Sequence, residues 1–441
     1  MRILFCNYEY PPLGGGGGVI NGLLAQELAK RHDVTVLTSR ALGLPAESIE
    51  NGVKIVRTPV FYRRHEAVAS LSSMLTFVLS GLRTGKKLLS KEGYDVINTH
   101  FVLPSGPVGA GLARFAGIPN VLTLHGGDLY DPSKIFSPHQ HLCLRMWVRW
   151  LLRRSDIVIG QSKNTLDNMR RYYTPEIEGL QVPLGIKRRP VSPASRSSYG
   201  FSENDILLIT VGRLIARKQV RHLLKVLQLM RDEPLHLLVV GSGPQESALK
   251  EIASNLSLQD RVHFLGQVEE TEKFRLLRMA DVYISASQHE GFGLVFLEAM
   301  SAGLPIVCYD HGGQTDFLAN GLTGYLLPLN DLNALAASCR SLVRDRALRD
   351  RMGRENLKRV EELYVERCAE RYEEIFQEAI KRCGLQRVVN LSSTKKLPLD
   401  LADAKLFEAG ITPSIGALTS MVDGKKPSEA LGSSGESLAK V

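Results

Sequence analysis

Two glutamates eight positions apart flank a glycine-rich segment in the second half of the sequence. Glu290 precedes Gly291-Phe292-Gly293-Leu294, and Glu298 follows that segment. Carboxylates accept hydrogen bonds from hydroxyl groups, so one of them can hold a sugar ring and the other a ribose. A helix through the whole segment would separate them by roughly 12 Å, more than the about 5–9.5 Å between the paired carboxylates of a glycosidase. A helix start that carries acidic residues by chance is the alternative.

Two cations stand upstream of these glutamates, at the end of an apolar run. Gly212 and Arg213 follow the run 206–211, and Lys218 comes five residues after Arg213. Cations placed there would neutralise a diphosphate as its bond to a sugar breaks. A second tight turn, from Gly241 to Pro244, follows the next apolar run. A solvated loop of arginine and lysine is the alternative.

A run of five glycines, Gly14 to Gly18, follows the first apolar run of the chain and opens a predicted helix. Its middle residues, Gly15, Gly16 and Gly17, would let a phosphate approach the free amides of the helix N-terminus. The alternatives are a flexible turn and a dinucleotide-binding fingerprint. The fingerprint fits poorly, because the second apolar run closes on Arg40 and not on an acidic residue.

A histidine stands at another predicted strand end in the first half of the sequence. His125 is followed by Gly126, Gly127 and Asp128. At the carboxyl end of a strand it would face a cleft and could hydrogen-bond a sugar hydroxyl or a developing charge. The alternatives are a structural role for His125 and, for Asp128, a cap on the next turn.

Short apolar runs that alternate with helical patterns must position these residues. Each half of the sequence contains five such runs, which predict buried parallel strands: 3–6, 34–37, 96–99, 121–125 and 157–159, then 206–211, 235–240, 262–265, 282–286 and 306–309. Repeated strand–helix units predict two doubly wound, Rossmann-like α/β domains in tandem. Ligands of such sheets bind beyond the carboxyl ends of the strands, where all of the candidate residues lie.

The predicted domain boundaries follow composition. We expect a first domain at 1–183, a proline- and serine-rich linker at 184–200 rather than a core segment, and a second domain at 201–365. Residues 331–383 are predicted to be helical throughout. The tail, 385–441, is rich in Ser, Gly, Lys and Pro, and its last part, 423–441, is predicted to be disordered.

Charge and composition narrow the possible partners. The 441 residues are 44% hydrophobic and carry a net charge of +9, and an excess of this size suits an anionic partner. The excess lies in residues 1–183 (21 Lys+Arg against 14 Asp+Glu) and in 184–200 (four against none), whereas 201–384 carries 23 against 26. No recognition-helix or zinc-finger pattern accompanies it, so nucleic acid is disfavoured.

Cysteine spacing and hydrophobic runs bear on the compartment. The six cysteines are scattered, which predicts reduced thiols and no metal site: Cys6, Cys143, Cys308, Cys339, Cys368 and Cys383. The first residues lack a signal-peptide pattern, and the longest apolar stretch, 67–82, is too short and too rich in serine to span a membrane. We therefore expect a cytoplasmic protein that can associate with the inner face of a membrane.

At this point the sequence resembles a known family, the family 4 retaining glycosyltransferases. The segment from Glu290 through Pro305 to Gly312-Gly313 is similar to the family's C-terminal hallmark. The other motifs match in order and approximate spacing: Gly14–Gly18, His125-Gly126, Gly212-Arg213, Lys218 and Gly241–Pro244. The resemblance covers about residues 1–383. It implies the GT-B architecture, with two Rossmann-like domains facing a cleft and helices around 366–384 crossing back onto the first domain.

The resemblance also implies roles. Arg213 and Lys218 would hold the diphosphate of a nucleoside-diphosphate-sugar, Glu290 the donor sugar and Glu298 the ribose. His125 would touch the sugar near its reacting carbon. The remaining donor-binding positions would be Gly15, Gly16, Gly17, Gly212, Gly241, Gly291, Phe292, Gly293 and Leu294. No metal or other cofactor is implied. One position departs from the family pattern: Gln219 follows Lys218 where a glycine is common, which puts the geometry of that loop in question.

Together these patterns favour a retaining glycosyltransferase that transfers a sugar from a nucleotide-sugar to a sugar or lipid-linked acceptor, in cell-surface polysaccharide or glycolipid assembly. The alternatives are a nucleotide-sugar epimerase or hydrolase of the same fold and a catalytically silent sugar-nucleotide-binding protein; a nicotinamide-dependent oxidoreductase is disfavoured. The segment 139–154 mixes tryptophans with arginines, a composition with which a helix can lie at a membrane surface. A helix packed on the core with its arginines in solvent is the alternative.

Overall fold

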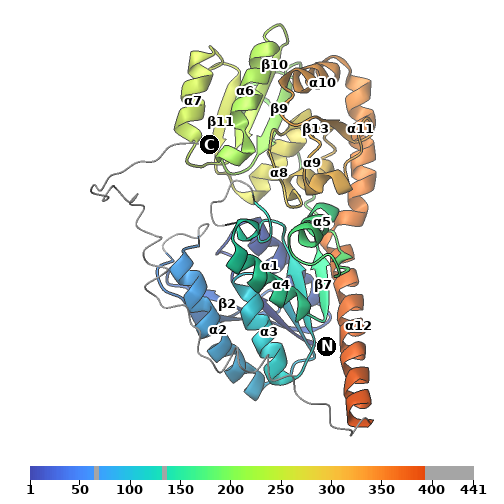
Figure 1. Ribbon diagram of the computed structural model, residues 1–441. Coiled ribbons are helices and arrows are strands. Elements are labelled where there is room, and N and C mark those ends of the chain that lie inside the picture. Colours follow the sequence, from blue (N-terminus) through green and yellow to red (C-terminus); the bar gives the residue numbers. More distant parts are fainter. Residues whose placement is uncertain (64–68, 132–136, 393–441) are drawn as a thin grey trace, which may run out of the picture. The chain divides into compact units, whose positions relative to one another are not determined.

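The computed structural model describes residues 1–63, 69–131 and 137–392, the last seven of them as backbone only (Figure 1). Residues 1–385 form one compact unit that contains two β-sheets. The predicted tail lies almost entirely outside the described residues. The fold class is confirmed: each sheet is built from strand–helix units, and the parallel strands are covered by helices.

The first sheet has eight strands in the order β3-β4-β2-β1-β5-β6-β7-β8, and only β3 runs antiparallel to its neighbour. The strand bounds are β1 Arg2–Asn7, β2 Asp33–Arg40, β3 Glu47–Glu50, β4 Val53–Pro59, β5 Val96–His100, β6 Asn120–Leu124, β7 Ile157–Gly160 and β8 Leu180–Gln181. The helices of this half are α1 Gly16–Leu28, α2 Leu71–Lys91, α3 Ser105–Ala116, α4 Leu142–Arg153 and α5 Lys163–Tyr172.

The second sheet has six parallel strands in the order β11-β10-β9-β12-β13-β14, with the order reversing between β9 and β12. The strand bounds are β9 Ile206–Val211, β10 Leu235–Val240, β11 Val262–Gly266, β12 Val282–Ile284, β13 Ile306–Tyr309 and β14 Gly324–Leu327. Its helices are α6 Val220–Leu229, α7 Glu246–Asn255, α8 Glu270–Met279, α9 Leu294–Ser301, α10 Leu332–Arg344 and α11 Arg346–Val360.

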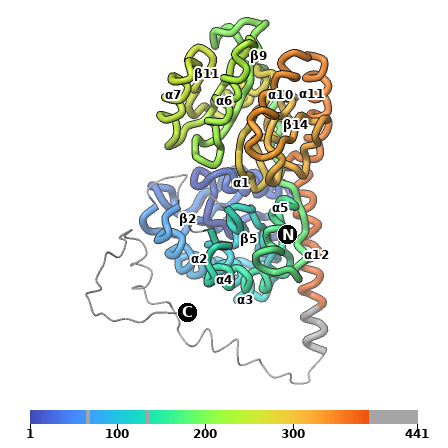
Figure 2. Tube along the Cα trace, turned by 45° about the horizontal axis from the view of Figure 1, so that its top comes forward, coloured from blue at the N-terminus to red at the C-terminus, as the bar shows by residue number. Residues whose placement is uncertain are grey.

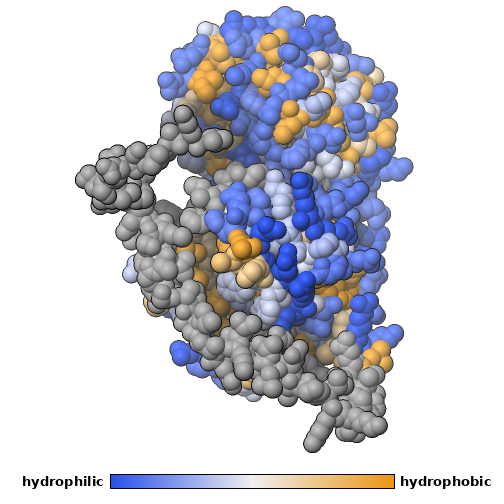
Figure 3. Space-filling view, in the orientation of Figure 1, coloured by the Kyte–Doolittle hydropathy of each residue, from blue (hydrophilic) through white to orange (hydrophobic). Residues whose placement is uncertain are grey.

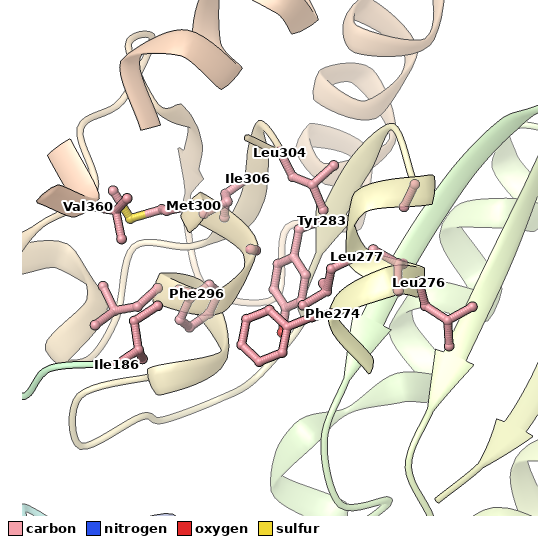
Figure 4. Packing of buried hydrophobic residues seen from close by; sticks show 14 of the residues in the cluster. Ile186, Phe274, Leu276, Leu277, Tyr283, Phe296, Met300, Leu304, Ile306 and Val360 are labelled. Carbon is pink, nitrogen blue, oxygen red and sulfur yellow. The ribbon is translucent and has the colours of Figure 1, made fainter. Parts of the chain in front are cut away.

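The core of the second sheet anchors the elements that carry the glutamates. Phe274 and Leu277 of α8, Tyr283 of β12 and Phe296 and Met300 of α9 are buried together (Figure 4). The rings of Tyr283 and Phe296 meet edge to face, 5.6 Å apart. Burial of such side chains contributes about 1.5–3 kcal/mol each and fixes the start of α9 against the sheet.

The last helix, α12 (Val365–Ser392), lies along the first sheet in the ribbon of Figure 1 and in the tube of Figure 2. Tyr372 and Phe376 are fully buried in one cluster with Phe5 of β1 and Val121 of β6. The chain thus returns from the second sheet to the core of the first.

The secondary structure differs from the prediction in several details. Four strands were missed: the charged β4, the exposed β3, the two-residue β8 and the glycine-initiated β14. The helical stretch 331–383 is broken where Asp345 caps α11 and by a turn of 3₁₀ helix before α12. The predicted linker also carries buried core residues, Leu184, Ile186 and Ala194, because irregular backbone packs under the second sheet. The proposed domain boundaries stay a prediction.

Candidate active site

The candidate residues collect at the carboxyl ends of the strands, beside the point in each sheet where the strand order reverses. The glycine loop follows β1 and His125 follows β6 in the first sheet. In the second sheet, Arg213 follows β9, and the loop with Glu290 follows β12. The order reverses between β1 and β5 and between β9 and β12, which opens a crevice at that edge of a doubly wound sheet.

A buried carboxylate with two cations forms the centre of the second-sheet half. The Nζ atom of Lys218 donates to Oε1 of Glu290 at short range, and Nη1 of Arg217 lies 3.4 Å from Oε2 of the same carboxylate. Arg217 also donates to the backbone oxygen of His289. The Glu290 side chain is 10% exposed. Burial would raise its pKa, but Lys218 and Arg217 outweigh that effect and lower it to about 2. Glu290 is therefore an anion at every physiological pH.

Arg213 lines a small pocket together with Gly212, Lys218 and Ser285. Its side chain is exposed, and within the described ranges it has no hydrogen-bond or ion-pair partner. Arg213 is thus available to an external anion, whereas Lys218 shares its charge with Glu290.

Glycines allow this pocket to form. Gly241, with a φ of +123°, lies so close to the first loop that a Cβ atom there would stand 2.1 Å from the carbonyl oxygen of Gly212. A Cβ at Gly243 would stand 2.5 Å from the carbonyl oxygen of Leu214. The turn that joins β10 to α7 therefore packs directly under the loop that carries Arg213.

Gln219 resolves the departure from the family pattern. It precedes α6 with φ +46° and ψ 40°, the left-handed conformation that glycine adopts without cost. The loop keeps its glycine-like geometry despite the side chain, at a cost of about 1–2 kcal/mol in backbone strain.

The segment between the glutamates is a loop followed by a short helix. A helix does not run through the whole segment: α9 starts at Leu294, and Glu290 lies in the preceding loop. Gly293, with φ +97°, forms the N-cap of α9, and Phe292 is buried against Phe317. The approximate helical distance between the glutamates therefore does not apply.

Glu298 occupies a different environment from Glu290. Its Oε1 accepts a hydrogen bond of 2.7 Å from Nζ of Lys273 in α8. Burial raises the pKa of Glu298, and Lys273 only partly offsets that effect. Each glutamate thus has a lysine partner, but the pKa of Glu290 is lowered whereas the pKa of Glu298 is raised.

The glycine loop places its free backbone beside the start of α9. Gly15 is the N-cap of α1, and a Cβ atom there would meet nothing within 4 Å. A Cβ at Gly16 would lie 3.5 Å from Leu294. A Cβ at Gly17 would lie 2.3 Å from the ring of Phe101, which follows β5. The loop is therefore packed on one side and open at Gly15.

His125 is buried at the end of β6, 7% exposed. Burial lowers its pKa to about 3, so its ring is neutral. Asp128 accepts hydrogen bonds from the backbone amides of His125, at 3.0 Å, and of Val102, at 2.8 Å. Asp128 therefore holds the ends of two neighbouring segments together, which is a structural role close to the predicted cap.

Contacts join the two halves of the site. Oγ of Ser162, the N-cap of α5, donates to the carbonyl oxygen of Gly291 at 2.8 Å. A Cβ at Gly126 would lie 2.9 Å from Cα of Gly291. The histidine loop and the glutamate loop are thus in direct contact.

Several residues of the site were missed by sequence reasoning. Arg217 and Lys273 each bind one of the two glutamates, and Ser162 binds the loop between them. Arg217 adjoins Lys218, so its position was a usable signal. Lys273 and Ser162 come from distant helices, and only the tertiary fold brings them to the site.

Family models match both halves of the chain. The model described as "Glycosyl transferases group 1" matches residues 191–359, and that described as "Glycosyltransferase Family 4" matches residues 14–186. Glycogen synthase of Mycobacterium tuberculosis is 31% identical over 374 residues, which cover 80% of this chain and 89% of that protein. The chain belongs to the family 4 glycosyltransferases.

Other relatives of this glycosyltransferase differ in what their names say they act on. N-acetyl-alpha-D-glucosaminyl L-malate synthase of Bacillus anthracis is 27% identical over 388 residues, 84% of this chain and 96% of that protein. Among solved structures, sucrose-phosphate synthase of Thermosynechococcus elongatus superposes with a TM-score of 0.75 at 23% identity, covering 86% of this chain and 99% of the other. A complex of Anabaena HepE with UDP-glucose gives a TM-score of 0.66 at 18% identity, with 86% and 100% covered. These structures share the GT-B fold.

Proposed function

We propose that this glycosyltransferase transfers a sugar from a nucleoside-diphosphate-sugar to an acceptor hydroxyl, with retention of the anomeric configuration. The observation that carries the proposal is the pocket lined by Arg213 and Lys218, of which Lys218 pairs with the buried carboxylate of Glu290. The two cations suit the anionic end of a ligand, and the carboxylate suits an end that is rich in hydroxyl groups.

The leaving group determines the chemistry that these cations can perform. As the bond between the anomeric carbon and the phosphate oxygen breaks, its electron pair passes to the diphosphate. Arg213, exposed and unpaired within the described residues, would bind that charge together with Lys218. This charge neutralisation needs no metal, and we propose a metal-independent reaction.

The acidic groups and free amides suit the rest of the donor. Glu290 is ionised and can accept hydrogen bonds from sugar hydroxyls. The backbone amides around Gly291 to Leu294 stand at the start of α9, where positive potential favours an anion. Glu298, further along α9, would accept from the ribose hydroxyls, and Gly15 to Gly17 would approach the phosphates.

The setting is proposed from relatives alone. The names of the relatives include a glycogen synthase and a malate-glycosylating enzyme, and one solved neighbour holds UDP-glucose. The two names give different products, and the UDP-glucose of the solved neighbour supports a nucleotide-sugar as the donor in this proposal. We place this chain in cell-surface polysaccharide or glycolipid assembly.

Product analysis tests the proposal. The full chain is incubated with UDP-, GDP- and ADP-sugars, with and without a mixed sugar and lipid-linked acceptor fraction, and nucleoside diphosphate release is measured. Transfer predicts release that depends on the acceptor, unaffected by EDTA and lost in Arg213→Ala. Retention predicts that the anomeric proton coupling of the product matches that of the donor. Acceptor-independent release would instead indicate a hydrolase, and binding without release a silent binding protein.

Helix α4 supports contact with a membrane. Its exposed residues include Leu142, Met146, Trp147 and Trp150, at 69%, 57%, 38% and 38% exposure. Two of its arginines fold back onto the protein, because Arg145 and Arg149 donate to the backbone oxygens of Tyr172 and Tyr173, whereas Arg153 is exposed, as the alternative expects, and pairs with Glu176. The exposed face of α4 therefore combines these apolar side chains with Arg153, in a basic half of the chain.

An apolar helix face beside basic residues suits an anionic lipid surface. None of the helices in the described residues is long and apolar enough to cross a membrane. On the face drawn in Figure 3, hydrophobic residues form small patches among hydrophilic ones. We propose peripheral contact, through which a lipid-linked acceptor would be reached.

Vesicle co-sedimentation tests this contact. At low salt the full chain should sediment with vesicles that contain anionic phospholipid. The double variant Trp147→Ser/Trp150→Ser should sediment with them to a smaller extent. A matched control is Leu180→Ser, which is also exposed, at 45%, but lies on a strand edge. Absence of binding at low salt would remove the membrane proposal and leave the glycosyl-transfer proposal intact.

A further inference from the structure

The ring of His125 is the end of a buried hydrogen-bonded chain. Its Nε2 atom lies 3.0 Å from Nδ1 of His100, and Nε2 of His100 lies 2.6 Å from Oδ1 of Asn98. Asn98 and His100 are fully buried on β5, next to β6, the strand that His125 follows. The order of these three residues is set by the pairing of two parallel strands.

The donor and acceptor directions of these hydrogen bonds are fixed at Asn98. Its Nδ2 atom donates to the backbone oxygen of Val121 at 3.0 Å and to Oγ1 of Thr123 at 3.1 Å. A peptide oxygen can only accept, so the amide cannot be turned around. The Oδ1 atom therefore faces His100, and Nε2 of His100 must carry a proton.

The proton on His100 determines the tautomer of His125. Burial and the neighbouring His125 hold the pKa of His100 well below its usual range, so its ring carries a single proton. Nδ1 of His100 is therefore an acceptor, and Nε2 of His125 must donate to it. Since burial keeps the His125 ring neutral, its Nδ1 atom carries a lone pair and no proton.

Aromatic packing holds both rings in place. The His100 ring lies between Phe5, at 5.3 Å and 14°, and Tyr372 of α12, at 6.3 Å and 9°. The His125 ring stacks on Phe101 at 4.2 Å and 26°. Neither ring can rotate without displacing these neighbours, so each ring nitrogen keeps its role as donor or acceptor.

The lone pair at Nδ1 of His125 has no partner among the residues that the structure describes. A buried acceptor without a partner is unfavourable, because it has lost its hydrogen bond to water. Its surroundings are the two loops of the proposed donor site: Phe101 lies against Gly17, and Gly126 lies against Gly291. A hydroxyl group brought by a ligand would satisfy the acceptor.

We infer that Asn98 and His100 are positioning residues that hold His125 in the tautomer whose Nδ1 accepts a hydrogen bond from a hydroxyl of the donor sugar. This rests on the proposed glycosyl transfer for the identity of the ligand. It follows that His125 is an acceptor and not a general acid, because Nδ1 has no proton to give. A donor sugar that lacks this hydroxyl leaves the acceptor unpaired and is disfavoured.

Nitrogen NMR of the full chain labelled with ¹⁵N-histidine tests the tautomer without any substrate. His125 and His100 are assigned by loss of signals in His125→Asn and His100→Phe. Both residues should show a protonated Nε2 and an unprotonated Nδ1 that do not change between about pH 6 and 8. A protonated Nδ1 on His125 would overturn the inference, whatever the outcome for glycosyl transfer.

Kinetics test the consequence of the relay. His100→Phe keeps a ring between Phe5 and Tyr372 but removes the acceptor for His125. We expect kcat with the active nucleotide-sugar to fall about tenfold or more, while the affinity for the free nucleoside diphosphate is unchanged. The matched control is Tyr372→Phe, which removes only a hydroxyl bonded to Thr123. Equal losses in both variants would show a merely structural role and overturn the assignment.

Discussion

Replacement of Lys218 by methionine would leave the buried carboxylate of Glu290 with Arg217 as its remaining cation. The pKa of Glu290 falls from an ordinary 4.5 to about 2 through these cations, and that drop corresponds to roughly 3 kcal/mol. Removal of one member of a buried pair typically costs about 3–5 kcal/mol. We therefore expect Lys218→Met to lower the free energy of unfolding by about 3 kcal/mol at pH 7.

The pH dependence of this loss has a definite sign. Glu290 has a depressed pKa in the folded state, so the unfolded chain binds its proton first as the pH falls. The stabilisation is fully present above about pH 4.5 and is lost as the pH falls towards 2. The difference in the free energy of unfolding between Lys218→Met and the wild type should accordingly become smaller as the pH falls from about 4.5 towards 2.

Urea unfolding of four proteins measures the pair: wild type, Lys218→Met, Glu290→Gln and the double variant. We expect the double variant to be more stable than Lys218→Met, with a coupling energy of about 2 kcal/mol or more. Lys250→Met is the control, because Lys250 pairs with Glu246 on the surface at 54% exposure, and it should change stability by about 0.5 kcal/mol or less. Additive effects of the two site substitutions would refute the reasoning.

Three further predictions concern the same loops. Gln219→Gly should raise the free energy of unfolding by about 0.5–1 kcal/mol by relieving the left-handed backbone, whereas Gln245→Gly before α7, where φ is −93°, should give no gain in urea unfolding. Gly17→Ala should lower the melting temperature because its Cβ would meet Phe101 at 2.3 Å, whereas Gly15→Ala, with no atom within 4 Å, should not; equal melting temperatures would contradict the packing. Burial lowers the pKa of His289 to about 4, so stability should fall as the pH drops below about 6.5. In His289→Gln the free energy of unfolding should fall less steeply with decreasing pH, by about 1.4 kcal/mol per pH unit. An unchanged slope would contradict the burial of His289.

The fold was largely readable from the sequence because buried parallel strands are continuous apolar runs. Three of the four missed strands, β3, β8 and β14, lie at a sheet edge, where β3 is exposed and β8 has only two residues. The fourth, β4, lies inside the sheet but carries Lys54 and Arg57. The core role of Leu184 and Ile186 was missed for a different reason, since irregular backbone has no hydrophobic period to detect.

The residues of the candidate site could be named from the sequence, but their contacts could not. Glycines and charged residues at strand ends marked Arg213, Lys218 and Glu290. That Lys218 pairs with Glu290, and that Glu298 pairs with Lys273 from another helix, depends on tertiary packing. The relay from Asn98 to His125 joins neighbouring strands that are distant in sequence, and no local pattern announces it.

A thermal-shift measurement with nucleoside diphosphates tests the central claim most directly. UDP, GDP and ADP are each added to the wild type, to Arg213→Ala and to the surface control Arg346→Ala, whose side chain is 87% exposed. A nucleotide present at 100 times its dissociation constant stabilises the protein by about 2.7 kcal/mol. The account predicts that at least one nucleotide raises the melting temperature of the wild type and of Arg346→Ala but not of Arg213→Ala. If none of the three shifts the wild type, or if the shift persists in Arg213→Ala, the donor site lies elsewhere.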